Sequence, residues 1–132
     1  MVRVTEQVLA DLKREGKPRP EDARFLMGFF KTGAGQYGAG DKFIGVRVPV
    51  IRRVAKRYRA ISLHDIERLL DSPIHEVRLA AVIIMTEEAL RADDGGQRAL
   101  FDLYLRRTDR INNWDIVDVS CRGVVGGYLL HH

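Results

Sequence analysis

The sequence predicts an all-α protein, and three observations support this class. Along most of the chain of 132 residues, apolar residues recur every three or four positions, which is the period of a helix with one buried face. Prolines and small polar residues stand where such helices would begin. No segment has the strict alternation of apolar and polar residues that is typical of a half-buried strand. We therefore expect about seven helices and no strand.

Two helices and a long loop are expected in the N-terminal part of the chain. Residues 4–15 form the first helix, and the Gly-Lys-Pro sequence at residues 16–18 ends it. Pro20 fits the first turn of a second helix, where its missing N–H is no loss, and the two acids after it favour a helix N-terminus. A glycine-rich loop then extends from Lys31 to Val48.

Two shorter helices are expected after this loop. Pro49 opens the first, and Ser62 caps the second, because its side-chain oxygen can accept a hydrogen bond from an N–H group that the first turn leaves unpaired. The apolar residues of the first have the spacing i, i+3, i+4, i+7 of one buried stripe: Ile51, Val54, Ala55 and Tyr58.

The central helix is expected to start at Ser72-Pro73 and to run to about Arg91. Its middle, residues 79–85, is apolar on all sides, so we predict that this helix is buried at the centre of the protein. Residues 93–96, with the sequence Asp-Asp-Gly-Gly, predict a turn. One more helix follows the turn, and Trp114 begins the last one.

The order of these elements favours a particular architecture. Short helices joined by tight turns tend to form antiparallel pairs, and such pairs stack into solenoids of the HEAT type with roughly 40 residues per repeat. No clean internal repeat is visible, so the pattern supports the all-α class more firmly than the solenoid. We predict one domain over residues 1–132, a right-handed α-solenoid (α-α superhelix) of HEAT-like antiparallel helix pairs.

Composition narrows the classes of partner. The net charge of +4 and the sequence pI of about 9.5 favour polyanions, nucleic acid first. The single cysteine, Cys121, cannot form an internal disulfide, and with the four histidines it makes no zinc-binding pattern. A single cysteine fits the reducing cytoplasm, where we expect the protein. No apolar run is long enough for a membrane span, and the N-terminus lacks the apolar core of a signal peptide.

The segment 112–118 holds the most informative candidate site residues. Trp114 is the only tryptophan, and Asp118 lies four residues later, so on a helix the indole and the carboxylate share one face, with Asp115 on the same side. An aromatic plate beside an acid suits chemistry on a nucleobase or a sugar. The alternative is structural: tryptophan is usually buried, and Asp115 would then only favour the start of a helix.

A basic run begins at Arg47 and ends at Arg59, with six cations and no acid. Such a run is usually a solvated helix face. Its arrangement also fits phosphate binding, which recognises the charge of the nucleic-acid backbone and not the base sequence. The candidate phosphate-binding residues are Arg47, Arg52, Arg53, Lys56 and Arg57.

Two other motifs receive structural interpretations. Residues 33–38 match G-x-G-x-x-G, but no strand precedes them and no helix begins within them, so we reject a dinucleotide site. Glu76 and Arg78, near the start of the central helix, are interpreted as an internal ion pair between neighbouring helices.

Three groups of motifs follow one another in order along the chain. They are residues 29–33, 36–41 and 43–49 followed by Arg52, then His75-Glu76-Val77-Arg78, and then Asn113-Trp114-Asp115-Ile116-Val117-Asp118. This ordered series resembles the bacterial DNA alkylation repair proteins, which are AlkD-like DNA glycosylases built from HEAT-like repeats, and its last segment is similar to the family's W-D-x-V-D segment. The resemblance covers about residues 20 to 130.

This resemblance implies a function and a site. It implies a solenoid that cradles double-stranded DNA on a basic concave surface and hydrolyses the N-glycosidic bond of cationic N3- or N7-alkylated purines without a metal or cofactor. Asp118 would be the catalytic carboxylate, and Trp114 and Asp115 would line the lesion site. The alternatives are a helical-repeat protein that binds DNA without excising a base, and a scaffold for protein partners.

The family's later repeats have no counterpart in this chain, so we expect it to correspond to the N-terminal part of a longer family fold; the alternative is a naturally short relative. The last helix would then present apolar residues with no further element to cover them. We predict that residues 121–130 pack against a second copy of the chain. Sedimentation at micromolar concentration is expected to find a homodimer, and a monodisperse monomer would contradict this prediction.

Overall fold

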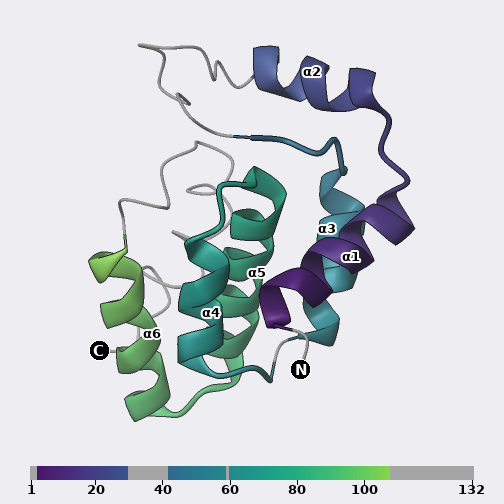
Figure 1. Ribbon diagram of the computed structural model, residues 1–132. Helices are drawn as coiled ribbons and strands as arrows, with labels where there is room; N and C mark the ends of the chain where they lie inside the picture. The colour runs from purple at the N-terminus through teal and green to yellow at the C-terminus, as the bar shows by residue number, and fades with distance from the viewer. Residues whose placement is uncertain (1–2, 30–41, 59, 108–132) are drawn as a thin grey trace.

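The structure is a computed structural model that describes residues 3–29, 42–58 and 60–107. These ranges contain six helices and no named strand, which confirms the all-α class. The helices are α1 (Val4–Gly16), α2 (Pro20–Phe29), α3 (Val48–Arg57), α4 (Leu63–Leu70), α5 (His75–Arg91) and α6 (Asp94–Arg106) (Figure 1). The last helix expected from the sequence, which begins at Trp114, lies outside the described residues. The solenoid arrangement stays a prediction.

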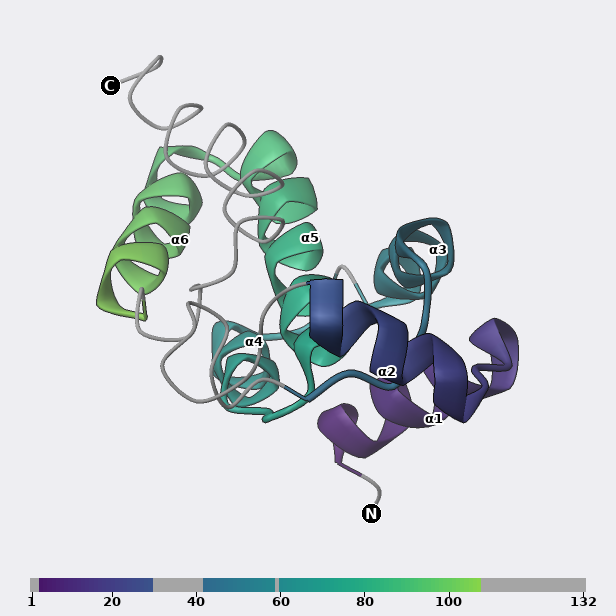
Figure 2. The same cartoon turned by 90° about the horizontal axis from the view of Figure 1, so that it is seen from above.

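Helix α5 is the centre of the fold, as its apolar middle predicts. It packs against α1, α3, α4 and α6, and Figure 2 shows α3, α4 and α6 on three different sides of it. Every residue from His75 to Met85 is buried. A helix with neighbours on all sides has no face that water must solvate, which is why its sequence lacks a polar stripe there.

The helix starts follow the local signals in the sequence in two places. Pro49 lies in the first turn of α3, and the Ser62 hydroxyl accepts a hydrogen bond of 3.1 Å from the backbone N–H of Asp65 at the start of α4. Helix α5 starts slightly later than Ser72-Pro73 predicts. The Ser72 hydroxyl accepts from the N–H of Ile74 at 3.1 Å, and helical hydrogen bonding begins only after that turn.

The turn expected at residues 93–96 is wrong. These residues form the cap and the first turn of α6, because the Asp93 carboxylate accepts a hydrogen bond of 2.8 Å from the N–H of Gly96. A Cβ atom at Gly96 would lie 2.8 Å from the Cβ of Ala92, so the glycine allows a tight connection between α5 and α6. The side-chain cap outweighs the low helix propensity of the two glycines.

The segment before α3 is tied to the start of α5. Lys42 and Ile74 form an isolated parallel bridge, in which the N–H of Lys42 donates to the carbonyl of Pro73 at 3.2 Å and the N–H of His75 donates to the carbonyl of Lys42 at 2.7 Å. The Phe43 ring stacks on the His75 ring with a centroid distance of 4.3 Å. This segment therefore forms part of the packed structure rather than a loose connection.

Glu76 makes the strongest of these links. Its buried carboxylate accepts hydrogen bonds from three successive backbone N–H groups, those of Ile44 at 3.1 Å, Gly45 at 2.8 Å and Val46 at 3.0 Å. Gly45 has φ +93°, a left-handed conformation that turns these donors toward one acceptor. A Cβ at Gly45 would also lie 2.9 Å from the backbone nitrogen of Ala23.

The interpretation of Glu76 and Arg78 as an ion pair is therefore corrected. The Glu76 carboxylate binds backbone N–H groups, and the Arg78 guanidinium donates to the carbonyl of Ser72 at 3.1 Å. Residues two apart on a helix point to different sides, so each side chain finds its own partner. Within the described ranges, no helix is long and apolar enough to cross a membrane.

We expect Glu76→Gln to lower the free energy of unfolding by roughly 3 kcal/mol, because the neutral amide leaves buried N–H groups without a charged acceptor. Urea denaturation followed by circular dichroism measures this. The control is Glu87→Gln, at an acid whose ion pair with Arg91 at 3.6 Å lies at the surface of α5; it is expected to change stability by less than about 1 kcal/mol. Equal effects of the two changes would contradict the role given to Glu76.

Candidate nucleic-acid interface

Helix α3 presents its cations to solvent because its apolar stripe is used elsewhere. Ile51, Val54 and Ala55 are buried, and α3 packs against both α1 and α5. The opposite face of the helix must then point outward. The five candidate phosphate-binding residues are all exposed: Arg47, Arg52, Arg53, Lys56 and Arg57.

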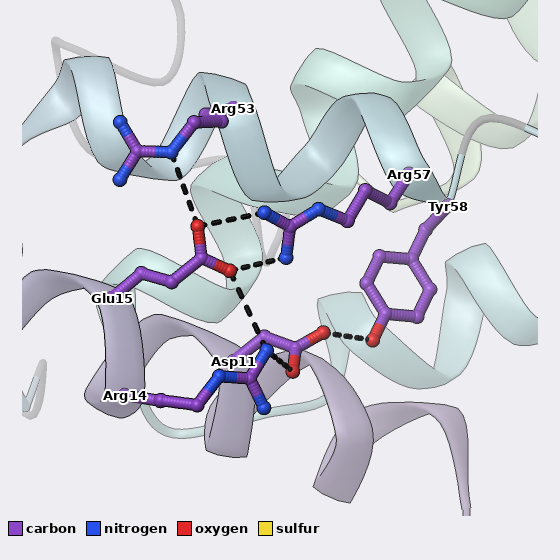
Figure 3. Close-up of polar contacts among 6 residues, drawn as sticks. All are labelled: Asp11, Arg14, Glu15, Arg53, Arg57 and Tyr58. Carbon is purple, nitrogen blue, oxygen red and sulfur yellow. Dashed lines mark hydrogen bonds and ion pairs between the residues drawn. The ribbon is translucent and has the colours of Figure 1, made fainter.

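An acid on α1 divides the four cations within α3 into two groups. The Glu15 carboxylate accepts from Nε of Arg53 at 3.1 Å and from both terminal nitrogens of Arg57, with Nη2 at 2.8 Å (Figure 3). Arg52 and Lys56 have no ion-pair partner among the described residues. The first group holds α3 to α1, whereas the second remains available to a ligand.

The two arginines of the first group are not equivalent. Both terminal nitrogens of the Arg57 guanidinium donate to Glu15, so they are not available to a second partner. Arg53 binds Glu15 through Nε, and Figure 3 shows its terminal nitrogens directed away from the carboxylate. Arg53 is thus oriented by Glu15 and keeps an edge that can receive a phosphate oxygen.

The charge of Glu15 is strongly stabilised. Hydrogen bonds from Arg57, and next from Arg53, lower the pKa of the Glu15 carboxyl to about 2, against the opposing effect of burial. The same hydrogen bond to Glu15 raises the pKa of Arg57. Glu15 and Arg57 therefore stay charged at neutral pH, and the contact that they make between α1 and α3 is ionic throughout the physiological range.

A second contact between α1 and the C-cap of α3 lies beside the Glu15 cluster. The Tyr58 hydroxyl donates to the Asp11 carboxylate, and Arg14 pairs with that carboxylate at 2.6 Å and with Glu15 at 3.5 Å (Figure 3). Burial, followed by the hydrogen bond to Asp11, raises the pKa of Tyr58 to about 12. The phenol therefore remains a hydrogen-bond donor throughout the physiological range.

A separate ionic cluster lies between α4 and the end of α6. Glu67 accepts from Arg106 at 3.1 Å and from Arg107 at 2.9 Å, and Arg107 also binds Asp71. The hydrogen bond from Arg107, and then that from Arg106, lowers the pKa of the Glu67 carboxyl. Because acids compensate these arginines, this end of α6 is a weaker candidate for phosphate binding than α3.

The residues that the sequence offers for catalysis lie outside the described residues. These are Asp118, Trp114 and Asp115. The apolar stretch 121–130, predicted to form a dimer contact, and the loop residues 33–38 also lie outside the described residues. Among the residues that the structure describes, no group of histidine, cysteine, aspartate and glutamate side chains is arranged to hold a metal ion.

Sequence reasoning missed Glu15 as the partner of the basic helix. The acid lies 38 residues before Arg53 and 42 residues before Arg57, on a different helix. Its spacing from the apolar residues Val8 and Leu12 in α1 offers a partial signal, because the three residues share one side of that helix. The signal identifies an acid beside the buried face but not the arginines that meet it.

The fold and this surface define an all-α protein with a basic helix directed at solvent, which suits a polyanionic partner. A model of the family described as DNA alkylation repair enzyme matches residues 8–132. The chain belongs to this family. The matched residues include α3 and the segment 112–118. No curated protein and no solved structure was found to match the chain.

We expect Glu15→Gln to lower the melting temperature at pH 7, since α1 and α3 lose their shared carboxylate. A carboxyl whose pKa falls from 4.5 to about 2 on folding stabilises the fold above pH 4.5, and this contribution disappears as the pH falls toward 2. The difference in melting temperature between wild type and variant should therefore close over that range.

Thermal melts at several pH values test this, with Glu6→Gln, at an exposed acid near the other end of α1, as the matched control. The control is expected to melt close to the wild type at every pH. A difference between wild type and Glu15→Gln that stays constant from pH 7 to pH 2 would contradict the ionic role of Glu15.

Proposed function

We propose that this protein is a DNA glycosylase that hydrolyses the N-glycosidic bond of cationic N3- or N7-alkylated purines in double-stranded DNA. Membership of the DNA alkylation repair enzyme family supports the repair function, and this match is the observation that carries the proposal. The uncompensated cations of α3 support DNA as the partner.

The proposed reaction needs one carboxylate. As the bond between C1′ and the base nitrogen breaks, its electron pair leaves with the base and neutralises the cationic ring. Positive charge then develops on the sugar, and the Asp118 carboxylate stabilises it and orients a water molecule. The water oxygen bonds to C1′ and loses a proton to solvent, so the balance needs no oxidant, reductant or metal.

The remaining candidate residues receive distinct roles in this proposal. Trp114 and Asp115 line the lesion site, where the indole stacks on the alkylated base. Arg47, Arg52 and Lys56 contact DNA phosphates, and Arg53 adds its free edge. Arg57, whose two terminal nitrogens donate to Glu15, holds α1 and α3 together instead.

Two further parts of the proposal concern the setting of the reaction. We place the protein in the cytoplasm, in association with the nucleoid when it acts on DNA. We retain the homodimer through residues 121–130 as a proposal from their apolar sequence.

Asp118→Asn is expected to lower the single-turnover rate of base release at least about 100-fold, because the amide cannot stabilise the developing sugar cation. Release of the base from a duplex that contains N7-methylguanine measures the rate. The matched control is Asp102→Asn, at an exposed acid on α6 that pairs with Arg98 at 3.7 Å; it should keep the wild-type rate.

If wild type binds the duplex but releases no base, the protein is a DNA-binding member of the family without this activity. If it binds no DNA either, the scaffold alternative is favoured.

The double change Arg52→Gln with Lys56→Gln is expected to flatten the dependence of log affinity on log salt by about 0.9 for each phosphate that the variant no longer binds. Fluorescence anisotropy on an undamaged duplex measures this slope. The double change Arg91→Gln with Arg98→Gln removes the same charge from α5 and α6, where both arginines pair with acids of their own helix, and should keep the slope. An unchanged slope for the α3 variant would mean that these cations only solvate the helix.

A further inference from the structure

A groove lies between the end of α1 and the start of α2, outside every candidate site derived from the sequence. Its volume is about 390 Å³, within the range of ligand-binding clefts. Its lining contains three cations and no acid: Lys13, Lys17, Pro18, Arg19, Pro20 and Ile44.

The charge in this groove comes from its two lysines. Lys13 and Lys17 are exposed, stand one turn apart, and have no ion-pair partner among the described residues. Two like charges at this spacing repel each other. Arg19 contributes less, since it pairs with Glu21 at 3.8 Å and with Asp22 at 3.5 Å.

The backbone at Lys17 is a second and independent observation. Lys17 has φ 45° at the C-terminal cap of α1, and it is the one non-glycine residue with a positive φ in the part of the chain that the structure describes. Glycine is the residue that adopts this left-handed cap without strain. The adjacent Gly16 serves another purpose, because a Cβ there would lie 2.9 Å from the Val46 side chain. Lys17 thus places a cation at a backbone position whose conformation favours glycine.

The groove lies close to the start of α3. Gly16 packs against Val46, and Val46 precedes Arg47, the N-cap residue of α3. The pKa of the Asp22 carboxyl is lowered chiefly by the backbone N–H of Arg19, and the charge of Arg47 contributes to the same shift. Arg47 therefore lies within electrostatic reach of Asp22 at the start of α2.

We propose that Lys13 and Lys17, with Arg19, bind a backbone phosphate of the DNA and extend its binding surface from α3 to the connection between α1 and α2. The groove is open, and its lysines act as point charges without buried donors, which suits an extended polyanion better than a small anion. This inference rests on the proposed DNA binding.

The test is the double variant Lys13→Gln with Lys17→Gly. Fluorescence anisotropy on an undamaged duplex should show a slope of log affinity against log salt that is smaller by roughly 0.9, because the variant no longer binds the phosphate in the groove. The single variant Lys17→Gly should melt at a higher temperature than wild type while it binds DNA more weakly, because glycine relieves the left-handed backbone and removes the cation. The double change Arg91→Gln with Arg98→Gln removes the same charge and should keep the slope.

The outcomes separate the inference from the proposed function. If wild type does not bind DNA, the proposed function fails. If wild type binds and its slope depends on Arg52 and Lys56 but not on Lys13 and Lys17, only the groove inference is overturned. Binding of inorganic phosphate is measured for wild type and for the double variant. If the double variant binds phosphate more weakly than wild type but keeps the DNA slope of wild type, the groove binds a free anion, and the groove inference is overturned. A lower melting temperature for Lys17→Gly would overturn the argument from the backbone.

Discussion

The buried carboxylate of Glu76 is the constraint on which the rest of the described structure depends. An isolated negative charge at this depth would be very costly, so the side chain requires donors, and the backbone N–H groups of residues 44–46 supply them. This requirement holds the segment before α3 against α5. It thereby fixes where α3 begins and directs Arg47 outward at the N-cap of that helix. The position of the basic surface is thus a consequence of a buried acid in another helix.

Local signals in the sequence predict the helices well because those signals act within one turn. Ser62 caps α4 through a hydrogen bond to Asp65, and the apolar run at residues 79–85 is buried as its pattern predicts. The errors arise where a partner lies far along the chain or where two local effects compete. Glu76 finds donors 30 to 32 residues away, and no spacing rule connects them. At residues 93–96, the glycines favour a turn, but the Asp93 side chain caps a helix. The candidate catalytic residues Asp118 and Trp114 rest on sequence alone.

The basic surface illustrates why net charge is a weak guide to binding. Arginines on one face of α3 have different environments: Arg57 is occupied by Glu15, Arg53 keeps one edge, and Arg52 has no ion-pair partner among the described residues. At the end of α6, acids compensate the arginines of a second cluster. Composition counts all these cations equally. The fold distinguishes them: among the described residues, Arg52 and Lys56 on α3 and Lys13 and Lys17 in the groove at the end of α1 have no ion-pair partner.

Phosphate contacts of this kind hold DNA without reading its sequence, so recognition of damage must arise elsewhere. In the proposed reaction, the positive charge of an alkylated purine distinguishes the damaged base, because a cationic base is a better leaving group than a neutral one. A basic surface alone would repel such a lesion. The two acids of the segment 112–118, Asp115 and Asp118, offer the opposite charge where the lesion would sit. The two proposed roles therefore follow from electrostatics. Cations on α1 and α3 bind the DNA backbone, and the acids of the segment 112–118 stabilise the positive charge that alkylation adds to the base.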